Sequence, residues 1–473
     1  MGSSDAGPMF AGGDTDTPSR SDAPAPDTAA VVASSTLLKP EVLVIGGGPA
    51  GSTAAALLAA RGRRVLLLEK ARHPRFHIGE SLLPMNLPIL QRLGVLEQVR
   101  AIGVHKAGAD FPLPGREEHN VFRFSRALAP TFDHAFQVRR ADFDALLFAH
   151  ARTAGADARE DVKVEDVEFG SDGRPSRVRA RDAQGAMLDI HPQYVIDASG
   201  RDTLFGAKLK LKQRNTAHQS AAIFSHYRGV QRFEGENAGN ITIARFAHGW
   251  LWVIPLPDDI TSVGAVCFPE YLKQRRGDNQ GFLERTLQLV PPVWKRMAGA
   301  ERVADVHVTG NYAYECSRMA GPGWVMAGDA YAFVDPIFSS GVFLAMNSAE
   351  QAAALADAVL DNPACEAELQ RAMSRRLRRG LRIFTWFICR FTAPAMRHLF
   401  AHPRNYLQLE QAVVSMLAGD VFDSRPVLRR LRVFRVVYYL TALRYLPEGV
   451  RHWRRKRRES ALDVAGETLH PSA

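Results

Sequence analysis

The sequence lacks the long apolar runs of a membrane protein and contains few cysteines. No segment of its 473 residues reaches the roughly 18 to 20 consecutive apolar residues that a membrane-spanning helix needs. The four cysteines (Cys267, Cys316, Cys365 and Cys389) form no CxxC pair and no pattern of metal ligands. These absences argue against a disulfide-stapled secreted domain, and we expect reduced thiols, no metal site and a cytoplasmic location.

The first 39 residues also have few large apolar side chains. They are rich in Ser, Asp, Ala, Pro and Gly, and they lack the basic-then-apolar order of a secretory signal. A segment of this composition cannot bury enough apolar surface to offset the loss of chain entropy. We therefore expect residues 1–39 to be a disordered leader.

Acidic residues are scarce near the C-terminus. The chain has a net charge of +10, and residues 371–458 hold 21 Lys and Arg against four Asp and Glu. The basic residues alternate with an apolar helical pattern, LRRLRVFRVVYYLTALRYL, which leads to RHWRRKRR. Such a helix is typical of peripheral contact with an anionic membrane, here at its inner face, and it favours that partner over nucleic acid. Solvated arginines on an ordinary helical domain explain the same pattern, and both interpretations stay open.

The strongest pattern in the sequence is a glycine turn, in EVLVIGGGPAGSTAAALLAARGRRVLLLEK. An apolar strand leads into Gly46, Gly48 and Gly51, a helix of small residues follows, and a second strand ends at Glu69. In a GxGxxG turn the glycines permit a tight bend, close approach of a pyrophosphate and close packing of helix on strand. The segment predicts a Rossmann-like α/β domain that binds a dinucleotide, with Glu69 at a ribose hydroxyl.

A second segment indicates which dinucleotide is bound. In GWVMAGDAYAFVDPIFSSGVFLAMNS a strand leads to Gly328 and Asp329, and a long helix begins near Gly341. The Asp329 carboxylate on a tight turn can accept hydrogen bonds from a sugar-like chain. With FQVRRADFDALL and YVIDASGRD between the two glycine motifs, residues 40–360 resemble the FAD-binding flavoprotein monooxygenase superfamily. The resemblance implies FAD rather than NAD as the cofactor.

Three short segments resemble one branch of this superfamily, the flavin-dependent halogenases of phenol or carrier-bound substrates. FHIGESLLP matches the family's Gly-Glu-Ser segment, FVDPIFSSG its F-x-x-P-x-x-S-x-G spacing, and GWLWVIPLPDD its W-x-W-x-I-P signature. The resemblance implies that Trp250, Trp252 and Pro255 form a bulky wall beside the flavin. Taken alone, the last segment predicts a half-buried strand with both tryptophans on one face.

The resemblance also implies a set of cofactor-binding residues. The residues expected at the FAD are Gly46, Gly48, Pro49, Ala50, Gly51, Glu69, Lys70, Arg140, Gly328, Asp329, Ser340 and Gly341. The halide is expected at Ser340 and Gly341, where backbone N–H groups open a helix. Some relatives bond FAD covalently through an aspartate, and Asp335 is the position to compare, although a turn aspartate before a proline is the simpler interpretation.

The reaction implied by the resemblance needs an amine near the flavin. A partner NAD(P)H-dependent reductase would supply reduced FAD, which with dioxygen and chloride or bromide would give hypohalous acid. Lys106, in GVHKAGADF, matches the position of the family's catalytic lysine, which would hold the hypohalous acid beside the aromatic substrate. A lysine in a dry tunnel would have a lowered pKa. The alternative is an ordinary surface lysine.

Phe338 stands where halogenases of free tryptophan carry a glutamate. The chain cannot use this position as an acid or base, which favours an electron-rich phenol or pyrrole, either free or bound to a carrier protein. His77 and His105 are candidate general bases, and hydrogen-bonded structural histidines are the simpler interpretation. Glu80 is a candidate to organise the site near Lys106 or to cap a helix.

The expected architecture is α/β, with a Rossmann-like FAD-binding domain of the flavoprotein monooxygenase fold. Residues 40–360 form this domain with a strand-rich substrate layer inserted at residues 205–304, and residues 361–473 form a helical C-terminal domain with the basic tail. The expected function is FADH2-dependent halogenation of an aromatic in secondary-metabolite or pigment biosynthesis. The alternative is an FAD-dependent aromatic hydroxylase or another flavin oxidoreductase on the same scaffold, which a solvent-facing Lys106 would favour.

Overall fold

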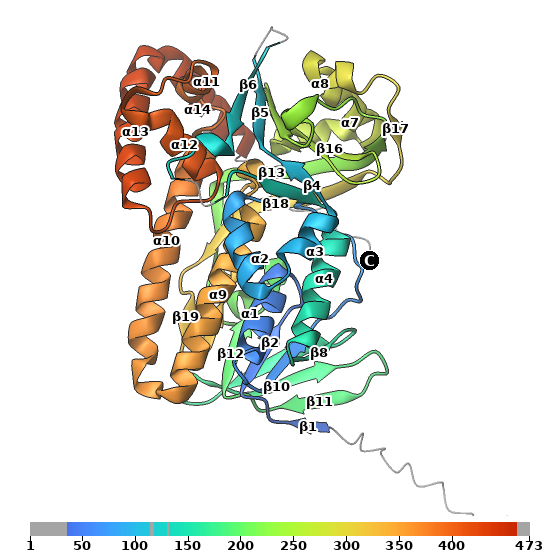
Figure 1. Ribbon diagram of the computed structural model, residues 1–473, viewed down its shortest axis with the longest axis vertical. Helices are drawn as coiled ribbons and strands as arrows, with labels where there is room; N and C mark the ends of the chain where they lie inside the picture. The colour runs from blue at the N-terminus through green and yellow to red at the C-terminus, as the bar shows by residue number, and fades with distance from the viewer. Residues whose placement is uncertain (1–35, 114–117, 130–131, 461–473) are drawn as a thin grey trace, which may run out of the picture. The chain divides into compact units, whose positions relative to one another are not determined.

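A computed structural model of the chain shows alternating strands and helices that build three main sheets (Figure 1). It describes residues 36–113, 118–129 and 132–460, so most of the expected leader lies outside the described residues. The last part of that leader is structured, because β1 (Thr36–Leu38) pairs in parallel with β11 (Met187–Ile190). The described residues all fall within one compact unit.

A six-stranded sheet carries the glycine turn. Its strands, in order across the sheet, are β19 (Ala320–Gly321), β20 (Trp324–Met326), β12 (Tyr194–Asp197), β2 (Val42–Ile45), β3 (Val65–Leu68) and β8 (Asp157–Arg159). All neighbours pair in parallel except β19 with β20. Every residue of β2 and β3 is buried, as expected for unbroken apolar runs in the middle of a parallel sheet.

Three helices line this sheet. Helix α1 (Pro49–Ala59) follows the glycine turn and packs against α4 (Arg140–Thr153) and α9 (Ser340–Asp361). Nine of the eleven residues of α1 are buried, and most of them are small, so neighbouring elements can approach it closely. The segments that the sequence assigns to the FAD-binding domain therefore meet in one layer, although α9 lies almost 300 residues after α1.

The largest sheet forms a separate layer above the first (Figure 1). Its main path runs β21 (Ala332–Phe333), β18 (His307–Cys316), β13 (Lys212–Arg228), β16 (Ile260–Cys267), β15 (Gly249–Pro255), β14 (Ile241–Phe246), β5 (Gly108–Pro112) and β6 (His119–Arg123), and β17 (Glu301–Arg302) pairs with β13. This layer includes strands on both sides of residues 205–304. Smaller sheets are formed by β1, β11, β10 (Pro175–Arg181) and β9 (Lys163–Phe169), and by β4 (Gly103–Lys106) with β7 (Ala135–Val138).

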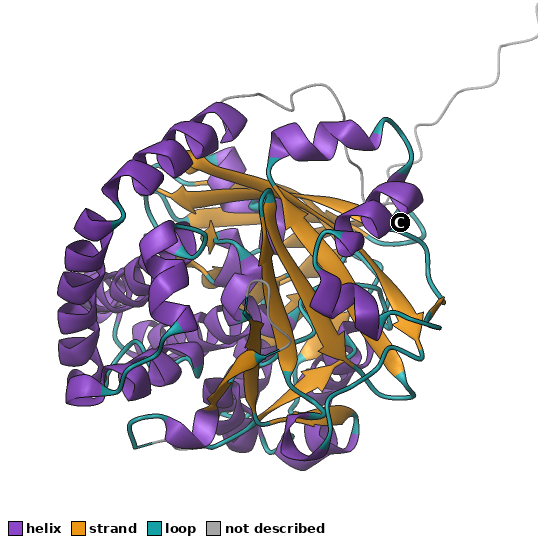
Figure 2. Ribbon diagram, turned by 90° about the horizontal axis from the view of Figure 1, so that it is seen from above, coloured by secondary structure: helices purple, strands orange, loops and turns teal. Residues whose placement is uncertain are grey.

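The two faces of the large sheet belong to different cores. Trp250 and Trp252 on β15 point into the main core, whereas Leu251 and Val253 point into a second core. The second core is closed by α6 (Pro269–Leu272), α7 (Asn279–Gln288) and α8 (Pro291–Arg296). Seen from above, the strands form a twisted layer with helices on both sides (Figure 2). The strand predicted for the tryptophan segment is confirmed, with both indoles on one face.

The C-terminal part of the chain is helical. Its helices are α10 (Glu366–Arg390), α11 (Pro394–Ala401), α12 (Leu409–Leu417), α13 (Arg425–Arg444) and α14 (Leu446–Ser460). The remaining helices are α2 (Leu87–Leu93), α3 (Leu96–Ala101) and α5 (Leu204–Lys208). Apolar side chains of α10 to α13 share the main core with the strands and helices of the six-stranded sheet. Within the described residues, no helix combines the length and the apolar character required to cross a bilayer.

Candidate active site

The glycine turn leaves room for a phosphate. An added Cβ on Gly51 would lie 1.7 Å from the carbonyl oxygen of Gly46, so only glycine lets α1 pack this closely. Gly48 precedes Pro49 and Ala50 in the first turn of α1 and caps the helix without a side-chain hydrogen bond. The nearest heavy atom to an added Cβ on Gly48 is 3.6 Å away, on Arg75. A dinucleotide pyrophosphate at the N-terminus of α1 stays a prediction.

Glu69 directly follows β3 and links the glycine turn to the next segment. Its two carboxylate oxygens accept hydrogen bonds from the backbone N–H of Gly47 at 2.6 Å and of Ala71 at 2.9 Å. The side chain thus has a structural role, and its contact with a ribose stays a prediction. Lys70 is more than half exposed and forms an ion pair with Asp202, so this residue lies at the outer edge of the expected cofactor site.

Arg140 is held firmly by its neighbours. Its guanidinium donates to both carboxylate oxygens of Asp144, at 2.8 and 2.9 Å, and to the carbonyl of Ile78 at 2.9 Å. Burial is the largest single effect and would raise the pKa of Asp144, but the charge and hydrogen bonds of Arg140, together with the charges of His77 and Arg75, lower that pKa. Arg140 therefore anchors the chain just before the Gly-Glu-Ser segment, and any contact with FAD stays a prediction.

Asp329 has the properties of a flavin-chain ligand. It follows Gly328, whose N–H donates to the hydroxyl of Ser348 on α9 at 2.8 Å. Burial raises the pKa of Asp329 to about 6, and the positive charges of Arg201 and Arg140 oppose that rise. Among the described residues, its carboxylate has no hydrogen-bond donor. An acceptor that lacks a protein donor at this place fits the hydroxyl groups of the FAD side chain.

The start of α9 has an unusual backbone conformation and no side-chain cap. Ser339 adopts a left-handed backbone conformation with φ of 56°, which is rare for a residue with a side chain and turns the chain into the helix. No side chain caps the helix, and Ser340 is buried in its first turn. An added Cβ on Gly341 would meet no described heavy atom within 4 Å. An anion or an electron-rich ring at this helix N-terminus stays a prediction.

Lys106 ends β4 and is buried, with 1% of its surface exposed. Its Nζ donates to the Ser81 hydroxyl at 2.8 Å and to the Leu82 carbonyl at 2.9 Å. The amine lies 5.3 Å from the centre of the Phe124 ring. Burial lowers the pKa of Lys106 to about 7. The interpretation of Lys106 as a surface lysine is therefore wrong.

The Gly-Glu-Ser segment connects this lysine to the large sheet. Glu80 is buried and its Oε1 lies 2.8 Å from Nε2 of His226 on β13, while Ser81 holds Lys106. Glu80 Oε2 has no hydrogen-bond partner within the described part of the chain. Glu80 is thus a link between two elements near Lys106 and does not cap a helix.

The two candidate histidines differ in environment. Nδ1 of His77 lies 2.8 Å from the carbonyl of Ile78, and burial and the charge of Arg140 lower the pKa of His77 to about 4. The ring of His105 is exposed and stacks on His134 with ring centres 4.8 Å apart. These contacts favour the structural interpretation of both residues.

The tryptophan pair forms a wall on the inner face of β15. The ring centres of Trp250 and Trp252 are 5.8 Å apart, and Trp252 donates to the Ser262 hydroxyl at 3.1 Å. Pro255 ends the strand and is buried. Asp335 accepts a hydrogen bond from the backbone N–H of Ile337 at 3.2 Å, which confirms the turn predicted for it.

Sequence reasoning missed three polar residues beside Trp250. Ser220 on β13, Thr392 after α10 and Lys456 on α14 line one cavity with this tryptophan. The strands and helices that carry them are far apart in the chain, so no local motif joins them. One signal was present: Lys456 is the single lysine among the 21 basic residues of positions 371–458.

Comparison with known proteins identifies the family of the chain. A family model described as an FAD binding domain matches residues 39–386, which makes the chain an FAD-dependent flavoprotein. A Pseudomonas fluorescens enzyme named as the chlorinase of 1H-pyrrole-2-carbonyl-[peptidyl-carrier protein] is 30% identical over 401 residues. These residues cover 78% of this chain and 87% of that protein. The solved structure of the myxobacterial chondrochloren halogenase CndH is 32% identical with a TM-score of 0.71, covering 86% of this chain and 96% of that one. The chain belongs to the flavin-dependent halogenase family.

One further relative limits what the family shows about substrate. A tryptophan 2-halogenase of Chondromyces crocatus is 35% identical over 305 residues, which cover 63% of this chain. The chain spans 57% of the length of that relative, less than two thirds. Named relatives thus include enzymes of different aromatic substrates, and the family alone does not choose between them.

Proposed function

We propose that this protein uses reduced FAD, dioxygen and a halide to halogenate an electron-rich aromatic ring. The observation that carries the proposal is the Lys106 amine, which is buried and directed by Ser81 and Leu82. FAD, when bound, supplies the oxidation of halide to hypohalous acid. A solvent-facing Lys106 would have favoured the hydroxylase alternative, and its burial supports halogenation instead.

The chemistry of Lys106 follows from its surroundings. A pKa of about 7 leaves a large neutral fraction of the amine near neutral pH. A neutral amine can accept a hydrogen bond from hypohalous acid, or it can form a haloamine with release of water. In the transfer of the halogen from nitrogen to the ring, the N–X bond breaks and the C–X bond forms, and the nitrogen takes up a proton in place of the one that the ring loses, which restores the amine. In either form, Lys106 keeps the oxidant at a fixed place beside the substrate.

The proposed halide site is the first turn of α9. No side chain caps the first turn of α9, and the helix dipole favours an anion there. The proposed substrate is a phenol or a pyrrole, free or bound to a carrier protein. Phe338 supports this choice, because it is buried and packs edge-on to Phe391 with ring centres 5.4 Å apart. Phe338 has no carboxylate that could act as an acid or base in the halogenation of a less electron-rich ring.

The proposed source of reduced FAD is a separate NAD(P)H-dependent reductase, because the sequence contains a single GxGxxG turn of the dinucleotide type. To test the function, we would supply the purified protein with a flavin reductase, NADH, FAD, oxygen and bromide. A panel of simple phenols and pyrroles would be the acceptors. Products with a bromine isotope doublet that require bromide support the proposal. Products that gain one oxygen atom with or without bromide support the hydroxylase.

We also propose that α13 and α14 contact an anionic membrane surface. Val436, Leu440 and Leu443 lie on one face of α13 and are exposed, with 67% of Leu443 accessible. Exposed apolar residues continue into α14 at Leu446 and Trp453. Arginines alternate with them along both helices, as expected for a helix that lies at a membrane interface.

Co-sedimentation with vesicles tests the membrane contact. The intact protein should pellet with vesicles rich in anionic phospholipid and remain in the supernatant with neutral ones. The double substitution of Leu440 and Leu443 by Gln should abolish pelleting, whereas Leu289→Gln, at another exposed leucine directly after α7, should leave it unchanged. Failure of the unmodified protein to pellet with anionic vesicles contradicts this proposal.

A further inference from the structure

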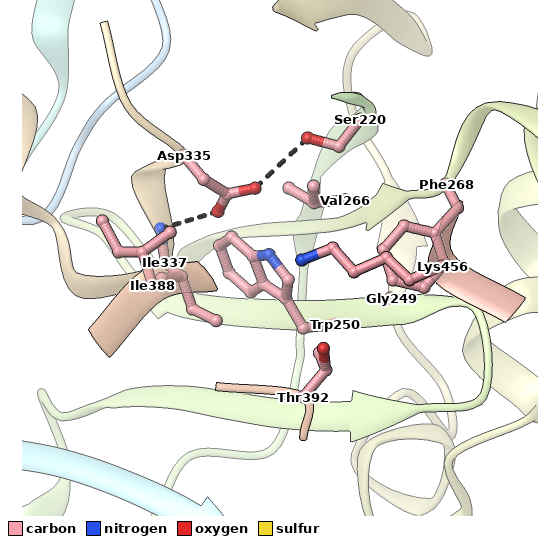
Figure 3. A pocket seen from close by; sticks show the side chains of 10 residues that line it. All are labelled: Ser220, Gly249, Trp250, Val266, Phe268, Asp335, Ile337, Ile388, Thr392 and Lys456. Atoms are coloured by element: carbon pink, nitrogen blue, oxygen red, sulfur yellow. Dashed lines mark hydrogen bonds between the residues drawn. The ribbon is translucent and has the colours of Figure 1, made fainter. Parts of the chain in front are cut away.

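The proposed reaction consumes a proton at a buried place. For each ring that is halogenated, reduced FAD, dioxygen, a halide ion, the aromatic and one proton give oxidised FAD, the halogenated ring and two molecules of water. Lys106 is 1% exposed, and the cavity beside Trp250 has free space for about one water molecule (Figure 3). A proton from solution therefore needs a route through side chains.

Glu80 and His226 form a pair that can carry a proton. Nε2 of His226 on β13 lies 2.8 Å from Oε1 of Glu80, and Glu80 is 2% exposed. The second carboxylate oxygen, Oε2, is buried and has no hydrogen-bond partner among the residues that the structure describes. A carboxyl group that is bonded through one oxygen can hold a proton on the other and act as a donor there.

The imidazole of His226 is open to solution on its other side. Its Nδ1 makes no hydrogen bond within the described part of the chain, and 16% of the side chain is exposed. The ring lies edge-on to Phe76 with ring centres 5.9 Å apart, and Phe76 is itself 49% exposed. His226 can therefore exchange protons with solution while its Nε2 faces the buried carboxyl group.

Glu80 lies near the residues expected at the cofactor. Burial would lower the pKa of the Arg140 guanidinium, but the charge and hydrogen bonds of Asp144 raise it. The charges of Asp329 and Glu80 raise this pKa further, so both carboxylates lie close to the same cation. Asp329 is the expected ligand of the flavin side chain, which puts Glu80 on the cofactor side of the site.

His226 lies beside the tryptophan wall. Phe224, two residues before it on β13, shares its face of the strand and packs against Trp252 with ring centres 5.7 Å apart. Ser262, which accepts the hydrogen bond of the Trp252 indole, stands opposite His226 in the sheet. The pair of Glu80 and His226 therefore has the wall on one side and Arg140 on the other.

We propose that His226 and Glu80 relay the proton from solution to the site. Glu80 releases the proton on Oε2 to the oxygen atom that leaves as water, and becomes a carboxylate. Protonated His226 then gives this carboxylate a proton through Nε2, and the neutral imidazole is protonated again from solution. No electrons move in these steps. This inference rests on the proposed function, since it names the proton source of the same reaction.

Reoxidation of the reduced, FAD-loaded protein tests the relay. The protein is mixed with oxygenated buffer that contains bromide, and the return of oxidised flavin absorbance is followed. His226→Gln keeps a hydrogen-bond donor at Glu80 but cannot carry a proton, so it should slow this return by about a hundredfold, as should Glu80→Gln. His226→Ala should be equally slow, and added imidazole should restore at least a tenth of the wild-type rate to this variant alone.

The matched control is His307→Ala, which should reoxidise at the wild-type rate. His307 stacks on the same Phe76 ring, with centres 4.5 Å apart, and has no carboxylate partner within the described residues. FAD content and the unfolding midpoint establish that each variant is folded. A wild-type rate in His226→Gln overturns the inference, as does a His226→Ala variant that imidazole does not accelerate. Brominated product is measured in the same samples, and slow variants of a protein that forms none would contradict halogenation alone.

Discussion

Nζ of Lys106 lies 2.8 Å from Oγ of Ser81, and both side chains are buried. The serine belongs to the Gly-Glu-Ser segment, and the neighbouring glutamate holds His226 of the large sheet. The chain before this segment is fixed by Arg140 through the Ile78 carbonyl. The amine is thus positioned by elements from three parts of the chain, as a group with a chemical role requires.

The halogenation rate should rise with pH through about 7. Burial lowers the pKa of Lys106 to about 7, so the amine is mostly protonated below this pH and mostly neutral above it. A protonated amine has no lone pair for hypohalous acid. The active form of Lys106 is therefore the neutral amine, which predominates above its pKa. The measurement is kcat for bromination against pH with reduced flavin in excess. A rate that falls as pH rises through 7 would contradict this role.

Ser81→Ala should move that inflection to lower pH. The hydroxyl accepts a hydrogen bond from the amine and so stabilises its charged form; its removal lowers the pKa of Lys106 by about half to one unit. Ser415→Ala is the control, because this serine is equally buried on α12 and accepts from Leu128 instead. An unchanged inflection in Ser81→Ala, or the same shift in both variants, counts against the contact.

Gly341→Ala should fold normally and weaken halide use. An added Cβ on Gly341 meets no described heavy atom within 4 Å, so the substitution causes no clash inside the protein and suits a helix. If the halide or the flavin occupies that space, the apparent KM for bromide should rise by about tenfold or the flavin should be lost, at an unchanged unfolding midpoint. Unaltered bromide dependence and flavin content would place both ligands elsewhere.

Gly51→Ala should prevent FAD binding. Its Cβ would lie 1.7 Å from the Gly46 carbonyl oxygen, which forces α1 away from the turn. Gly449→Ala is the matched control, because Gly449 lies within α14 with free space around it, and alanine there should stabilise the helix by up to about 1 kcal/mol. The ratio of flavin to protein absorbance after purification measures the difference. Full flavin content in Gly51→Ala would refute the assigned turn.

The parts of the fold that local patterns encode could be predicted from the sequence. The glycine turn, the strand that carries Trp250 and Trp252, and the helix that begins near Gly341 each depend on residues close together in the chain. Lys106 could be proposed from its segment, but its burial could not, because Ser81 and Phe124 come from other segments.

The cavity beside Trp250 could not be predicted, since its lining is assembled by the packing of distant elements. Ser220 comes from β13, Asp335 from the loop before α9, and Lys456 from α14. The sequence pattern of the basic tail predicts a solvated or membrane-facing surface, whereas Lys456 of this tail lines a cavity beside Trp250. Local sequence patterns report which residues share an element, whereas tertiary packing decides which elements meet.

Bromination by Lys106→Met under saturating bromide tests the central claim most directly. The variant removes the amine and keeps an apolar chain of similar length, and Lys163→Met, at an exposed lysine of β9, is the control. With a phenol that wild type brominates, the isotope doublet in the product should fall by about a hundredfold or more in Lys106→Met and stay unchanged in Lys163→Met, with full FAD content in both. A brominated product formed by Lys106→Met at the wild-type rate would contradict the account.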